Sequence, residues 1–121
     1  MKRRLALVVC AACVGAGPVP ALAHAFLDHA MPAVGSTVGT PPESVILRFT
    51  TPLEPSFSRL RVLDQSNRQV DRSDATVDPR DTSSLRVSLP KLPPGRYRVV
   101  WRVLSVDTHV TEGDFTFDVA Q

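Results

Sequence analysis

Three histidines and one aspartate are the residues of this chain best suited to metal chemistry. The histidines are His24, His29 and His109, and Asp107 stands two positions before the last of them. In an extended segment, side chains at positions i and i+2 face the same side and are about 6 to 7 Å apart at the backbone. A carboxylate oxygen and an imidazole nitrogen at this spacing could reach one ion, which makes Asp107 and His109 candidate metal ligands.

The residues before His24 make it a candidate for the N-terminus of the mature protein. The chain opens with basic residues at positions 2–4, continues with an apolar run over 5–14, and reaches Ala21-Leu22-Ala23, a small-residue cleavage site. This layout is typical of a secretory signal peptide and is too short for a stable transmembrane helix. We therefore expect residues 1–23 to be removed on export and residues 24–121 to form a single domain that starts with His24.

A histidine at the N-terminus offers two nitrogens to one metal ion. Its α-amino nitrogen and its own Nδ1 close a chelate ring, which is half of a histidine brace. A nitrogen from His109 would complete a T-shaped set and Asp107 could add an oxygen, a tetragonal environment that suits Cu(II). The sequence thus predicts one Cu(II) per chain, held by His24, Asp107 and His109. We leave His29 outside this set as a surface or supporting imidazole, and interpret Glu54 as a solvated loop carboxylate.

Charge and cysteine content exclude other classes of function. The leader holds three of the 14 basic residues, so the mature chain has 11 Lys and Arg against 12 Asp and Glu and no basic excess that would favour a nucleic-acid partner. Both cysteines, Cys10 and Cys13, lie in the leader. Thiolate metal sites and disulfides are therefore not expected in the exported protein. An alternative, disfavoured by the very short leader it implies, is that Cys13 is a lipidation site.

The mature sequence has the pattern of an all-β protein. Short runs of alternating or β-branched residues are separated by Pro, Gly, Ser and Asp, and no segment has a helical period. We predict a Greek-key β-sandwich of immunoglobulin-like type, with Tyr97 and Trp101 facing its core. The predicted strands are 25–29, 44–50, 59–63, 85–89, 96–104 and 114–120, with a weaker candidate at 69–75.

The same residues resemble those of a known family. The N-terminal histidine after Ala-Leu-Ala, the turn at 32–36, the runs 45–50 and 94–102, and the segment Ser105-Val106-Asp107-Thr108-His109 with Gly113 and Phe117 are together similar to the CopC family of periplasmic copper-resistance proteins. The resemblance spans nearly all of residues 24–121. It implies a copper-binding β-barrel or sandwich in the periplasm, a CopD-like inner-membrane copper transporter as partner, and His24, Asp107 and His109 as the Cu(II) ligands.

Two departures from the family pattern narrow this expectation. Some relatives have a Glu as a further oxygen ligand where this sequence has Thr51, and others carry a methionine-rich Cu(I) loop where the stretch 64–74 has no methionine. The sequence therefore indicates a monomeric carrier or buffer for Cu(II) alone. Two other classes of function stay open at this stage: a copper-dependent redox enzyme that uses the brace, and a metal-free immunoglobulin-like interaction module.

Overall fold

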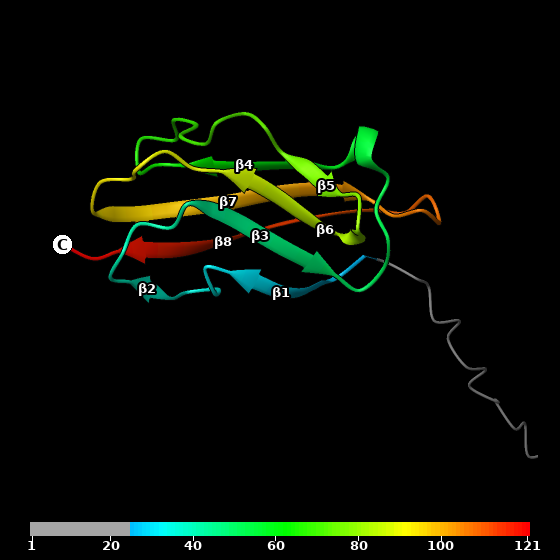
Figure 1. Cartoon of the computed structure of the whole chain (residues 1–121), viewed down its shortest axis with the longest axis horizontal. Coiled ribbons are helices and arrows are strands. Elements are labelled where there is room, and N and C mark those ends of the chain that lie inside the picture. Colours follow the sequence, from blue (N-terminus) through cyan, green and yellow to red (C-terminus); the bar gives the residue numbers. More distant parts are fainter. Residues whose placement is uncertain (1–24) are drawn as a thin grey trace, which may run out of the picture.

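A computed structural model describes residues 25–121 and shows two four-stranded β-sheets packed face to face (Figure 1). The predicted leader and His24 lie outside the described residues. No helix within 25–121 is long and apolar enough to cross a membrane. The strands are β1 (Leu27–Met31), β2 (Thr37–Val38), β3 (Ser44–Phe49), β4 (Arg59–Leu63), β5 (Thr76–Asp78), β6 (Asp81–Ser88), β7 (Gly95–Leu104) and β8 (Val110–Val119).

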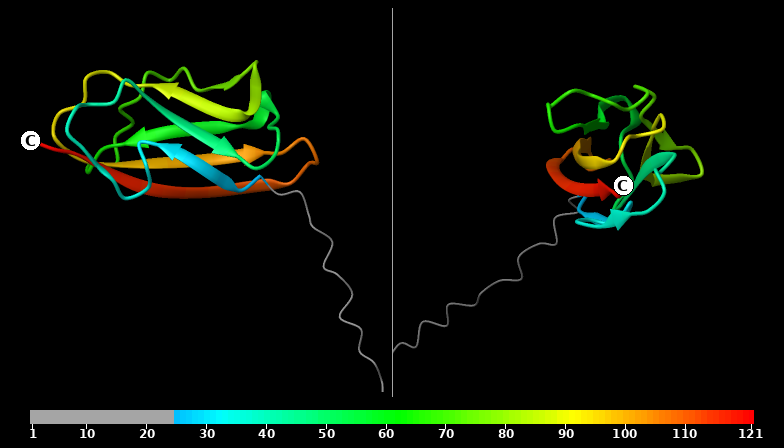
Figure 2. Two further views of the ribbon diagram at one scale, coloured as in Figure 1. Left: turned by 60° about the horizontal axis from the view of Figure 1, so that its bottom comes forward. Right: turned by 90° about the vertical axis from the view of Figure 1, so that its left-hand side faces the viewer.

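One sheet has the strand order β1-β3-β6-β5 and the other β2-β8-β7-β4. The chain changes sheet repeatedly, so each sheet is assembled from segments far apart in the sequence, as the two views in Figure 2 make visible. All pairings are antiparallel except that of β2 with β8. The predicted class, an all-β sandwich, is confirmed.

Alternation along the strands produces the core. Every second residue of a strand faces the opposite sheet, and the buried residues of β3 are Val45, Leu47 and Phe49. On β7 the inward positions include Tyr97, which is stacked on Phe117 at 5.7 Å between ring centroids. The expectation that Tyr97 faces the core is confirmed.

Trp101 also faces inward, and its place depends on a glycine. The indole contacts Phe49 and Phe115, with ring centroids 6.2 and 6.0 Å away. Its neighbour in the ladder is Gly113, where an added Cβ would lie 2.5 Å from the indole Cζ2. Only a residue without a side chain fits at that point of β8.

The predicted strand at 69–75 is wrong. Carboxylates capture the backbone there: Asp64 accepts from the N–H groups of Ser66 and Arg68, and Asp71 accepts from those of Ser73 and Val62. Such bonds favour turns over a regular ladder. A single isolated β-bridge, between Gln69 and Leu63, joins this stretch to β4.

Other boundaries also differ from the predicted ones. The short strand β2 was not predicted, β6 begins four residues before the predicted start at 85, and β8 begins at Val110 in place of 114. A 3₁₀ turn, η1 (Pro55–Phe57), interrupts the otherwise all-β chain. The extended conformation of these polar or short segments depends on pairing with neighbouring strands, and their own sequences show little alternation of polar and apolar residues.

Candidate metal site

The candidate ligands Asp107 and His109 lie in the loop that joins β7 to β8, at one end of the sandwich. The same end holds η1 and the first described residues, whereas the C-terminus lies at the other end (Figure 1). Ten consecutive residue pairs, from Gly95 with Val119 to Leu104 with Val110, hold the two strands below this loop. The loop therefore connects the two strands of the longest regular ladder of the fold.

The loop is a tight turn, so the premise of an extended segment is wrong. Ser105 N–H donates to the His109 carbonyl at 3.0 Å and Thr108 N–H donates to the Ser105 carbonyl at 2.9 Å. Thr108 has a φ of 74°, a left-handed conformation that closes turns. The turn nevertheless brings the two candidate ligands together, with Asp107 Oδ2 3.3 Å from His109 Nδ1.

That separation matches two atoms bound side by side to one ion. Metal–nitrogen and metal–oxygen bonds are about 2.0–2.2 Å long, so two ligand atoms at a right angle around an ion are about 3 Å apart. The side chains of Asp107 and His109 are 31% and 42% exposed, although His109 Nδ1 itself is buried. The separation of the two donor atoms is compatible with neighbouring positions around one ion.

A buried serine orients the carboxylate. Ser105 is fully buried and its hydroxyl donates to Asp107 Oδ1, in a short contact, while the same oxygen lies 3.2 Å from the His109 carbonyl. The Ser105 hydroxyl, with a smaller contribution from His109, lowers the pKa of Asp107 below its ordinary value. At neutral pH this carboxyl group is ionised, as a metal ligand must be. Ser105 belongs to the sequence motif that contains Asp107 and His109, but the motif alone gives no sign of this orienting role.

A second threonine anchors the start of the described chain beside the loop. Thr111, on β8, donates its hydroxyl to the carbonyl of Ala25 at 2.7 Å. Ala25 itself is buried, and the following residue, Phe26, exchanges two hydrogen bonds with Thr50 through its backbone. Nothing in the sequence pattern indicated the Thr111 contact, because the two residues are 86 positions apart.

The other residues considered from sequence differ in their exposure to solvent. His29 is exposed on β1 opposite Arg48, in agreement with its interpretation as a surface imidazole. Glu54 is half-buried and precedes η1, so it is less solvated than predicted. Thr51 is half-buried, and its hydroxyl has no hydrogen-bond partner among the described residues. Within residues 25–121, no group of three or more His, Cys, Asp and Glu side chains could hold a metal ion.

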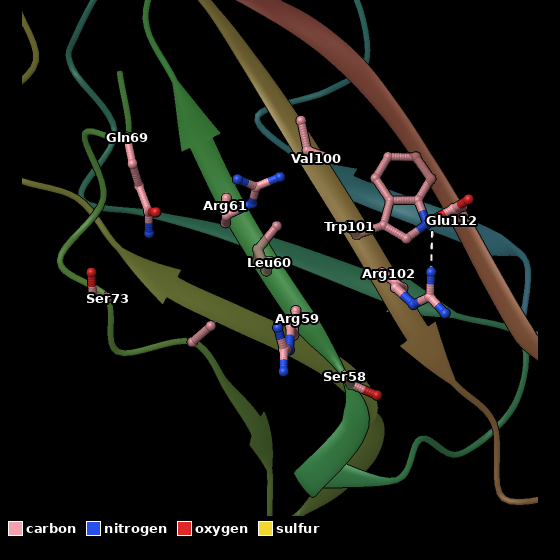
Figure 3. A pocket seen from close by; sticks show the side chains of 11 residues that line it. Ser58, Arg59, Leu60, Arg61, Gln69, Ser73, Val100, Trp101, Arg102 and Glu112 are labelled. Atoms are coloured by element: carbon pink, nitrogen blue, oxygen red, sulfur yellow. Dashed lines mark hydrogen bonds and ion pairs between the residues drawn. The ribbon is translucent and has the colours of Figure 1, made fainter. Parts of the chain in front are cut away.

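The most prominent hollow lies away from this loop. It holds about 620 Å³ and is lined by β4, β7 and β8, with Arg59 and Arg61 on β4 and the ion pair of Arg102 with Glu112 at 3.4 Å (Figure 3). Its lining contains no histidine and one acidic residue. The hollow therefore lacks the imidazole groups that favour copper, which the β7–β8 loop has in His109.

Comparison with known proteins places these features in a family. The model of the CopC domain matches residues 27–120. Protein YobA of Escherichia coli K12 is 37% identical over 98 residues, which cover 80% of this chain and 79% of that protein. Copper resistance protein C of Escherichia coli is 33% identical over 106 residues, 82% of this chain and 83% of the relative.

A longer relative and two solved structures extend the comparison. Copper transport protein CutJ of Bacillus subtilis is 27% identical over 105 residues, 86% of this chain but 19% of CutJ. The crystal structure of CopC from Methylosinus trichosporium OB3b has a TM-score of 0.75 and 35% identity, covering 80% of this chain and 94% of that one. PcoC, a methionine-rich copper resistance protein from Escherichia coli, has a TM-score of 0.67 and 35% identity, with 80% and 99% coverage. The chain belongs to the CopC family, whose copper-resistance and copper-transport members indicate a copper-binding protein and not an enzyme.

Proposed function

We propose that this protein is exported to the periplasm, binds one Cu(II) per chain as a monomer, and carries or buffers that ion for a CopD-like inner-membrane transporter. Its ligands are the α-amino nitrogen and Nδ1 of His24, freed by removal of residues 1–23, a nitrogen of His109, and an oxygen of Asp107.

The hydrogen bond from Thr111 to the Ala25 carbonyl is the observation that carries this proposal. His109 precedes Thr111 by two residues, so their Cα atoms are at most about 7 Å apart. A residue joined to Ala25 by a peptide bond has its Cα about 3.8 Å from the Ala25 Cα. The anchor therefore supports the proposal that the start of the mature chain and the Asp107–His109 pair share one ion.

The donor set supports Cu(II) over other ions. Amine, imidazole and carboxylate donors follow the Irving–Williams order, in which Cu(II) is bound more tightly than Ni(II), Co(II) or Zn(II). Cu(I) prefers sulfur ligands, and the two cysteines lie in the leader. Met31, the one methionine among the described residues, is exposed at the far end of β1 from Ala25. PcoC is described as methionine-rich, whereas this chain is not.

Extension of the mature N-terminus by one glycine before His24 tests the proposal. The α-amino nitrogen becomes an amide, which no longer closes the chelate ring, so we expect the Cu(II) affinity to fall by orders of magnitude. The unfolding temperature of the metal-free protein should not change, because the core does not involve that atom. Competition titration and calorimetry of both forms, with the N-terminus verified by mass spectrometry, provide the measurement. Equal affinity and an identical Cu(II) spectrum in the extended protein would place the site elsewhere.

A further inference from the structure

Four exposed apolar side chains gather at the end of the sandwich that carries Asp107 and His109. Six large apolar side chains between residues 25 and 121 are strongly exposed, and the four at this end are 50–66% exposed. We call these four the apolar rim: Phe26, Phe57, Val106 and Val110. No motif in the sequence marks these four residues as a group.

Backbone contacts fix Phe57 and Val110 at this end. The Glu54 N–H donates to the Leu104 carbonyl at 2.8 Å, which attaches η1, and with it Phe57, to the end of β7. Leu104 is also the ladder partner of Val110. Phe57 and Val110 therefore flank the last residue of β7, immediately before the loop.

The other two members flank the loop from within it and from the first sheet. The Val106 N–H donates to the Pro52 carbonyl at 3.1 Å, so Val106 is held against the segment that follows β3. Phe26 is held to Thr50, at the start of that segment, by its backbone N–H and carbonyl. Phe26 also follows Ala25, the residue bonded to Thr111 beside the loop. The rim thus lies at the same end of the sandwich as Asp107 and His109.

Direct copper transfer would bring a partner onto this surface. When a metal passes from one protein to another by ligand exchange, an incoming donor atom must approach within about 2 Å of the ion. The partner's surface then covers whatever surrounds the site. Exposed apolar groups, and aromatic ones in particular, are typical of the buried centre of protein interfaces.

We propose that the apolar rim is the docking surface for the membrane copper transporter, and that the partner presents its copper ligands within an apolar ring of its own. The inference rests on the proposed function. It is supported by CutJ, in which a segment similar to 86% of this chain occupies 19% of a longer copper transport protein. A domain of this type can therefore share one chain with the rest of a copper transport protein, which is the arrangement expected if the two make contact.

Copper delivery by rim variants tests the docking surface. The Cu(II)-loaded mature protein is mixed with the CopD-like transporter in lipid nanodiscs, and binding and copper transfer are followed against empty nanodiscs. In the variant Phe57→Asp, which lies outside the ligand loop, a charge replaces an apolar side chain, and we expect unchanged Cu(II) affinity with transfer slowed tenfold or more. Val34→Asp is the matched control: Val34 is 61% exposed, and the adjoining Gly35 contacts Thr116, six residues along β8 from Val110 and hence about 20 Å away.

The outcomes separate the docking surface from the metal site. A wild-type protein that binds no Cu(II) in titration would refute the proposed function. Cu(II) binding by both proteins, with transfer at the same rate, would refute the docking surface alone. Equal binding of the wild type to empty nanodiscs would assign the rim to a lipid surface and overturn the proposal. Loss of Cu(II) binding in the Phe57→Asp variant would assign Phe57 to the support of the metal site and overturn the docking surface.

Discussion

The body of the β7–β8 hairpin and the loop at its tip are held together by different interactions. Residues 95–104 and 110–119 form an uninterrupted antiparallel ladder whose inward side chains are apolar and largely buried. In the loop, residues 105–109 are held by the Ser105 hydroxyl, short backbone bonds and one left-handed residue, Thr108. The body determines whether the protein folds, and in the proposed function the loop provides two of the metal ligands. Because the loop contributes little apolar burial, its ligands can be changed at small cost to stability.

Truncation of a core side chain in the body should have the largest effect. Phe117 is 1% exposed and stacks on Tyr97. Phe117→Ala is expected to lower the free energy of unfolding by about 3–5 kcal/mol, from lost burial and the cavity left behind. Urea denaturation of the metal-free protein measures this. Cu(II) affinity of the folded fraction, titrated at low temperature, should stay the same, and a large loss of affinity would show that body and loop are not separable.

Removal of a ligand from the loop should give the reverse pattern. His109→Ala deletes a nitrogen donor, and we expect more than a hundredfold loss of Cu(II) affinity, which is about 2.7 kcal/mol, with little change in the unfolding temperature. Asp107→Ala should cost less if its oxygen is an axial ligand, and His29→Ala should cost at most the 10 to 100-fold of a supporting group. Competition titrations of the three variants rank these effects. A dominant role for His29 would move the site to β1.

The role of Ser105 can be separated from its burial by a matched pair. Ser105→Ala removes the hydroxyl that orients Asp107, and we expect a 10 to 100-fold loss of Cu(II) affinity, as for other groups that orient a ligand. Ser83 makes a similar bond to Asp81 Oδ1, at 2.6 Å, on the other sheet. Ser83→Ala should therefore leave Cu(II) affinity unchanged. Equal affinity of both variants in parallel titrations would contradict an orienting role for Ser105.

Surface charge on the hairpin body should matter least. Arg96 pairs with Asp118 at 2.9 Å across the ladder, and the pKa of Asp118 is lowered mainly by this bond. A lowered pKa in the folded state stabilises the protein at neutral pH, and the contribution disappears as the pH falls through that lowered value. Both groups are exposed, so Arg96→Ala should reduce the unfolding temperature by little more than the error at pH 7. The difference should vanish near pH 2, and a difference that grows in acid would reverse the sign of this linkage.

The sequence by itself determined the fold class and the composition of the candidate site. Alternation of side chains indicated the inward face of β7, and the range predicted for β4 matches the structure. The choice of His24, Asp107 and His109 came from a cleavage pattern and a local motif, which are both short-range signals. The predictions failed where side chains compete for the backbone, as in the segment 64–75, and where a strand is short, as in β2.

Only the tertiary structure decided how the site is put together. The pairing of Asp107 with His109 depends on a turn closed by Thr108, and the sequence pattern did not distinguish this turn from an extended strand. The anchor from Thr111 to Ala25 and the gathering of Phe26, Phe57 and Val106 join residues between about 30 and 86 positions apart. Contacts at such separations have no periodic signature, because they arise from the packing of two sheets and not from the propensities of either segment.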